Sequence, residues 1–183
     1  MKRLITTYFF LLFILLSVAA NAEIEKKVVP CEQQKMCIYW WPKLAIIQGW
    51  HHERNFSYQY GFNAQAPDGF TFANAESVIY AKALYKPSIP ETKSLEMLIS
   101  KDKNDFISRD PNIIVSEVTS LKTGNGQNLK SFTFFPQGKG NWEQVSYGEE
   151  GEFYLIFTVS SKSEEGFTKV LDTYKQFINQ YKE

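Results

Sequence analysis

The sequence predicts an α+β domain in which helices cover a mostly antiparallel sheet. Two observations carry this prediction. Residues 113–159 contain four strand-like stretches separated by tight turns, which is typical of consecutive β-hairpins. Residues 164–181 then place large apolar side chains at steps of three and four, so they form an amphipathic helix. The apolar face of such a helix is stable only against another layer, and the hairpins supply a sheet.

The first predicted hairpin joins strands at 113–121 and 129–135 across Thr123–Gly126, whose Asn-Gly step favours a tight turn. The second joins 142–148 and 153–159 across Glu149-Glu150-Gly151. Ser161 or Ser163 caps the closing helix. Its apolar stripe consists of Phe167, Val170, Leu171, Tyr174, Phe177, Ile178 and Tyr181.

Earlier in the chain, residues 77–85 are almost continuously apolar, which predicts a central strand covered on both faces. Ser94 is a good N-cap for a helix that ends at Asp110-Pro111. Residues 38–41 and 44–47 form a first strand region divided by Pro42, and residues 51–62 form a helix with Gly61 as its stop.

The N-terminus has the three parts of a secretory signal peptide. Lys2 and Arg3 precede an apolar run at 8–20, and Ala20-Asn21-Ala22 ends it. The alternative, a retained anchor, is less favourable because about 13 residues rise only about 20 Å as a helix. We therefore expect cleavage of residues 1–22, a flexible lead-in at 23–30 and one domain at 31–183, exported to the periplasm or secreted.

Composition argues against several functions. Loss of Lys2 and Arg3 changes the formal net charge from +0 to −2, and no basic run suggests nucleic-acid binding. No later apolar stretch is long enough to span a membrane. The glycines lack the strand–turn–helix setting of a phosphate-binding loop, and we predict no cofactor.

Cys31 and Cys37 are the only cysteines, in CEQQKMC. In an exported protein a close pair predicts a disulfide, worth about 2 kcal/mol in the chain-entropy model. A redox or metal role and free thiols are the alternatives, although the C-x5-C spacing lacks the C-x-x-C geometry.

The stretch GWHHERNFSYQY holds both histidines of the chain, His51 and His52, followed by Glu53. Adjacent side chains diverge on a helix or strand, and no third histidine exists, so we predict no metal site. A two-histidine site completed by Glu53 or a distant aspartate remains an alternative, as does a triad with a serine.

Aromatic residues gather around the histidines. Trp40, Trp41 and Trp50, with tyrosines nearby, are either core material or an exposed contact surface. The candidate binding residues are Trp40, Trp41, Trp50, His51, His52 and Glu53.

The hairpin with a Gly-Asn turn, the WEQVSY strand, the FYLIFTVSS strand and the terminal helix together resemble the PsbP-like α/β/α sandwich over residues 67–181. This resemblance implies a binding or accessory role without shared catalytic residues. We therefore predict an exported, soluble binding or accessory protein of the bacterial cell envelope, whose partner is an envelope protein or a small ligand. The alternative is a small hydrolase or metal-dependent enzyme centred on His51, His52 and Glu53.

Overall fold

The computed structural model describes residues 24–31 and 35–182. Thirteen elements follow one another along the described chain, which runs through β1 (Ile24–Pro30), β2 (Met36–Pro42), β3 (Trp50–His52), α1 (Arg54–Tyr60), β4 (Asn63–Pro67), β5 (Ser77–Tyr85), the 3₁₀ turn η2 (Lys86–Ser88), α2 (Leu95–Arg109), β6 (Ile114–Lys122), β7 (Asn128–Phe135), β8 (Trp142–Glu150), β9 (Phe153–Ser161) and α3 (Glu164–Asn179). No helix of the described residues is long and apolar enough to cross a membrane. The predicted signal peptide lies outside these residues.

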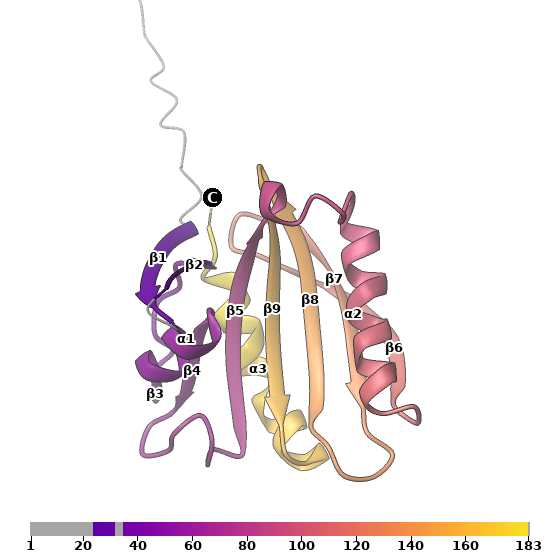
Figure 1. The fold of residues 1–183 in the computed structure, drawn as a ribbon. Coiled ribbons are helices and arrows are strands. Elements are labelled where there is room, and N and C mark those ends of the chain that lie inside the picture. The colour runs from indigo at the N-terminus through magenta and orange to yellow at the C-terminus, as the bar shows by residue number, and fades with distance from the viewer. Residues whose placement is uncertain (1–23, 32–34, 183) are drawn as a thin grey trace, which may run out of the picture.

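The strands form one antiparallel sheet in the order β1-β2-β5-β9-β8-β7-β6 (Figure 1). Strand β5 pairs along its whole length with β9. Its other edge is shared, because β2 pairs with it at Ala83 and β4 pairs with it from Ile79 to Ala81. Strand β3 adds to β4. The predicted α+β class with a mostly antiparallel sheet is therefore confirmed.

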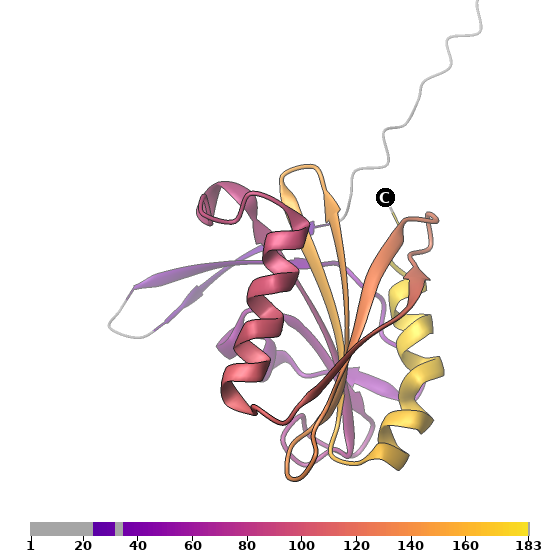
Figure 2. The ribbon, with the colours of Figure 1, turned by 90° about the vertical axis from the view of Figure 1, so that its right-hand side faces the viewer.

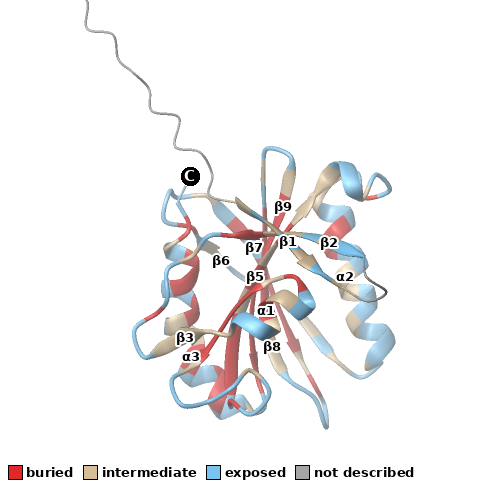
Figure 3. Cartoon of the chain, turned by 60° about the vertical axis from the view of Figure 1, so that its left-hand side comes forward, coloured by how far each residue is buried: buried red, intermediate tan, exposed pale blue. Residues whose placement is uncertain are grey.

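One long helix packs on each face of the sheet (Figure 2). Helix α3 covers the inner positions of β5 and β9 with Phe167, Tyr174 and Phe177, all of them buried. Helix α2 contributes Leu98 and Ile99 to a second apolar cluster over β7, β8 and β9. Buried residues follow the same pattern, on the strands and on the inner sides of the helices (Figure 3).

The expected lead-in at 23–30 is wrong for the residues described, since Ile24–Pro30 form β1. This strand pairs with Met36–Pro42 in continuous antiparallel register. The hairpin projects from the body of the domain (Figure 2). Its far end is closed by the Cys31–Cys37 disulfide, with Cα atoms 5.7 Å apart, as predicted. Sequence reasoning read the charges of 23–30 as a sign of disorder, whereas cross-strand pairing makes this segment regular.

Two other expectations near the histidines differ from the structure. Residues 44–47 are not a strand, and the helix predicted from 51 begins only at Arg54, because His51 and His52 pair with Ala66 and Gln65 of β4. The stop at Gly61 is as expected: this residue caps α1 with φ of 73°. A Cβ there would lie 2.4 Å from the Tyr39 ring. Both the positive φ and this close approach therefore require glycine.

Candidate functional site

The two histidines point away from each other, as alternation along β3 requires. On one side, His51 Nε2 lies 2.8 Å from Glu53 Oε1, and His51 Nδ1 lies 3.6 Å from Asp68 Oδ1. On the other, His52 Nε2 lies 3.0 Å from Ser57 Oγ. No group of three or more His, Cys, Asp or Glu side chains suited to a metal ion occurs in the described part of the chain.

The contact between His52 and Ser57 resembles half of a catalytic triad but is built as a structural bond. Ser57 is fully buried, and its Oγ also accepts the backbone N–H of Ala64 at 3.0 Å. The hydroxyl therefore joins α1 to β4. Burial, followed by the nearby charges of Lys27 and Arg54, lowers the pKa of His52 and favours the neutral imidazole. A serine without solvent access has no path to a substrate.

Trp40, Trp41 and Trp50 pack against aromatic or core residues. Trp41 is only 2% exposed and stacks on Tyr58 with ring centroids 5.9 Å apart. Trp40 lies 5.1 Å from Phe153, and both Trp40 and Trp50 pack against the core under α3. Trp41 is thus buried, whereas Trp40 and Trp50 are partly exposed and pack against the core.

A more concave surface lies elsewhere, on the sheet face that carries α2. Helix α2 packs over β7, β8 and the Tyr154–Ile156 part of β9, and α1 stands at the opposite margin of this face (Figure 1). Between them, residues of β5, β8 and β9 line adjoining hollows. We call this surface the sheet groove. Its floor is formed by Tyr80, Lys82, Glu143, Thr158 and Ser160.

Register explains why these floor residues meet. Residues that lie opposite one another on neighbouring strands project from the same face, and alternate residues continue that face along each strand. Read from β5 across β9 to β8, the floor has three rows: Val78, Ser160 and Glu143; Tyr80, Thr158 and Val145; Lys82, Ile156 and Tyr147.

Three adjoining hollows of about 310, 290 and 180 Å³ make up the groove, and Glu143 lines all of them. One end is aromatic, where Phe56 and Phe72 stack with centroids 3.9 Å apart. The other end is bounded by α2, which contributes Asp102, Phe106 and Arg109. Hollows of this combined size suit a small organic ligand.

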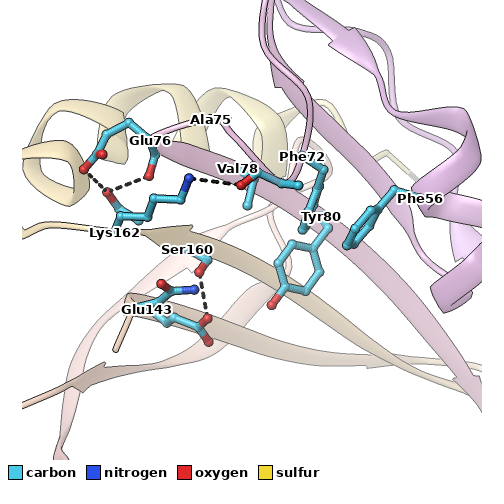
Figure 4. Close-up of a pocket in the computed structure, with 12 residues that line it drawn as sticks. Phe56, Phe72, Ala75, Glu76, Val78, Tyr80, Glu143, Ser160 and Lys162 are labelled. Atoms are coloured by element: carbon cyan, nitrogen blue, oxygen red, sulfur yellow. Dashed lines mark hydrogen bonds between the residues drawn. The ribbon is translucent and has the colours of Figure 1, made fainter. Parts of the chain in front are cut away.

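Glu143, which lines all three hollows, lies beside its cross-strand neighbour Ser160 (Figure 4). Its Oε1 accepts a hydrogen bond of 2.7 Å from Ser160 Oγ. Burial raises the pKa of the carboxyl above its ordinary value, and this effect exceeds the opposing one of the bond from Ser160. Burial of this carboxyl therefore disfavours its charged form.

Tyr80 links the aromatic end to the polar floor. Its ring lies 4.7 Å from Phe62 and 5.8 Å from Phe72, and its hydroxyl points away from Phe56 (Figure 4). Burial raises the pKa of the phenol well above its ordinary value, so the hydroxyl stays protonated and able to donate a hydrogen bond.

The charged side chains around Lys82 differ in whether they already form hydrogen bonds or ion pairs within the protein. Asp102 accepts a bond of 2.6 Å from the hydroxyl of Tyr147, and Glu143 accepts the one from Ser160. Lys82 makes no hydrogen bond or ion pair with any residue in the described ranges. Arg109 donates only from Nε, to the carbonyl of Asp105, and lies over the Phe106 ring. Lys82 is thus available to a ligand, whereas the charge of Arg109 already acts on the Glu143 carboxyl.

Sequence reasoning missed the whole groove, although two residues signalled it. Lys82 interrupts the apolar run SVIYAKALY, and Thr158 interrupts FYLIFTV. Both residues lie outside the apolar clusters that pack under α2 and α3. Neither signal shows which other residues join it, since Tyr80, Glu143 and Thr158 come from three strands.

A scan against protein-family models and a search of curated proteins gave no match to this chain.

Proposed function

We propose that the protein is an exported binding protein of the bacterial cell envelope that holds a small organic acid in the sheet groove. The observation that carries this proposal is that the acidic side chains around Lys82 already have hydrogen-bond partners, whereas Lys82 has none among the described residues. In the hollow that contains Lys82, both carboxylates, Asp102 and Glu143, already accept hydroxyl groups, whereas no ion pair joins Lys82 to another described residue. A ligand carboxylate would supply the missing partner, and charge-assisted hydrogen bonds are the stronger class.

The other end of the groove indicates the rest of the ligand. The Phe56–Phe72 pair and Val78 offer an apolar wall next to Tyr80. An amphipathic acid would place its apolar part there and its carboxylate at Lys82. A binding role also agrees with what the PsbP-like resemblance implies, and export with the predicted signal peptide and the disulfide.

The test uses 3-phenylpropanoate with two analogues of the same shape, 3-phenylpropanamide and 3-phenylpropylamine. NMR titration of the mature protein detects even millimolar binding. We expect the acid to shift the signals of Tyr80, Lys82 and Thr158, the amide to bind about tenfold more weakly and the amine least.

Variants assign the effect to the groove. Lys82→Met should weaken binding of the acid about tenfold, whereas Lys175→Met, on the exposed face of α3, should leave it unchanged. Equal binding of acid and amine, or equal loss in both variants, would overturn the proposal.

A further inference from the structure

A second hollow of about 370 Å³ lies on the other side of α1. Arg54 and Tyr58 are four residues apart and share one face of this helix, whereas Phe56, which lines the sheet groove, is about 200° away from Arg54. We call this hollow the cationic pocket. Its charged and aromatic lining residues are Glu25, Lys27, Lys43, Arg54, Trp41 and Tyr58.

The pocket brings together cations from three separate parts of the chain. Lys27 comes from β1, Lys43 follows β2 and Arg54 begins α1. Glu25 is the one carboxylate among the described lining residues, and it pairs with Lys27. Among the described lining residues, Lys27 and Arg54 thus face a single carboxylate.

The charges of Lys27 and Arg54 also act on a neighbouring group. The pKa of His52, which also lines the pocket, is lowered first by burial and then by the charges of Lys27 and Arg54. Its hydrogen bond to Ser57 further fixes the imidazole in the wall. The aromatic wall adds rigidity, because Trp41 and Tyr58 are stacked and Lys27 and Arg54 lie over their rings at 5.7 and 5.6 Å.

Buried amides hold the rim of the pocket in place. Asn63 Nδ2 donates to the carbonyl of Pro42 at 3.1 Å. Gln65 accepts the N–H of Ile47 at 3.0 Å and donates to the carbonyl of Ala45 at 2.9 Å. The segment that carries Lys43 is thus attached to β4 at three points, so the pocket exists without a ligand.

We propose that the cationic pocket binds the phosphate group of a small molecule. A phosphate carries more than one negative charge and several acceptor oxygens, so it can engage Lys27 and Arg54 together, and arginine matches phosphate geometry in a bidentate manner. The site is independent of the sheet groove, and its test does not depend on the organic acid proposed there.

The test measures pyrophosphate binding by isothermal titration calorimetry at constant ionic strength. Arg54→Gln and Lys27→Gln should each weaken binding about tenfold. Lys26→Gln is the matched control: it removes the same charge from the neighbouring position of β1, where the side chain lies over Trp40 instead, and should change binding less than about twofold. A second set of titrations compares phenyl phosphate with inorganic phosphate. Tighter binding of phenyl phosphate would indicate that the ligand is a phosphate ester, and tighter binding of inorganic phosphate would indicate the free ion.

Glu25→Gln supplies a gain of function that a damaged fold cannot imitate. It removes the carboxylate and releases Lys27, so pyrophosphate should bind several-fold more tightly. Absence of saturable binding, equal loss in the Lys26 and Arg54 variants, or no tightening in Glu25→Gln would overturn the proposal.

Discussion

Gln65 is a buried amide that holds a neighbouring segment of the chain in place. It is fully buried on β4, and its amide makes two hydrogen bonds to the segment at 45–47. We consider Gln65→Met, which preserves the length of the side chain but removes both hydrogen-bonding functions.

The magnitude follows from those two bonds. Each is worth about 0.5–1.5 kcal/mol net, and a buried backbone N–H or carbonyl left without a partner costs about 1–3 kcal/mol. Because Ile47 is itself buried in the core, its N–H has little access to water in the variant. We expect a loss of about 2–4 kcal/mol in the free energy of unfolding, which corresponds to about 5–15 °C in Tm for a domain of this size.

Urea denaturation followed by circular dichroism measures this loss. Gln59→Met is the matched control, because Gln59 is exposed on α1 and bonds only to the exposed Tyr60 hydroxyl; it should change stability by less than about 0.5 kcal/mol. If Gln65→Met were as mild as the control, the amide would not hold the 42–47 segment, and the account of the cationic pocket's rim would be refuted.

Three further predictions concern the groove, the hairpin and the core. Burial raises the folded-state pKa of Glu143, so the wild type should lose stability as the pH rises from the ordinary glutamate pKa through the folded-state pKa. Glu143→Gln should therefore be more stable than the wild type at pH 7 and equally stable below about pH 4. Thermal melts at several pH values measure this difference. Reduction of Cys31–Cys37 should cost about 2 kcal/mol, measured by denaturation with and without reductant, and an unchanged midpoint would contradict it. Gly148→Ala should cost about 1–3 kcal/mol, because a Cβ there would lie 2.6 Å from Cδ2 of buried Leu129; Gly138→Ala, which meets no atom within 4 Å, should be nearly neutral, and equal melting of the two variants would contradict this reasoning.

The sequence predicted those helices and strands well in which the pattern of apolar residues matches the face that is buried in the folded protein. Strand β5 begins and ends at Ser77 and Tyr85 as expected, and α3 buries its apolar stripe after the Ser163 cap. Strand β4 was missed because NAQAP has no strand propensity; its backbone is extended by pairing with β3 and β5, and its amides serve the neighbouring segment.

The sites could be predicted only in part, for a related reason. His52 and Trp41 line the cationic pocket, but nothing in GWHHERNFSYQY indicates that Lys27 and Lys43 join them. The sheet groove depends on cross-strand register between residues about 80 positions apart, such as Tyr80 and Thr158. The polar residues within apolar strands indicated single positions of the groove. Which residues lie next to one another there could be predicted only from the order of the strands in the sheet.

The central claim, that the sheet groove receives an organic acid, is tested most directly by a crystal structure of the mature protein with 3-phenylpropanoate. We predict that the carboxylate lies within about 3 Å of Lys82 Nζ and that the phenyl ring lies against Phe56 and Phe72. A ligand bound elsewhere, or one whose carboxylate faces solvent while Lys82 stays unpaired, would contradict the account.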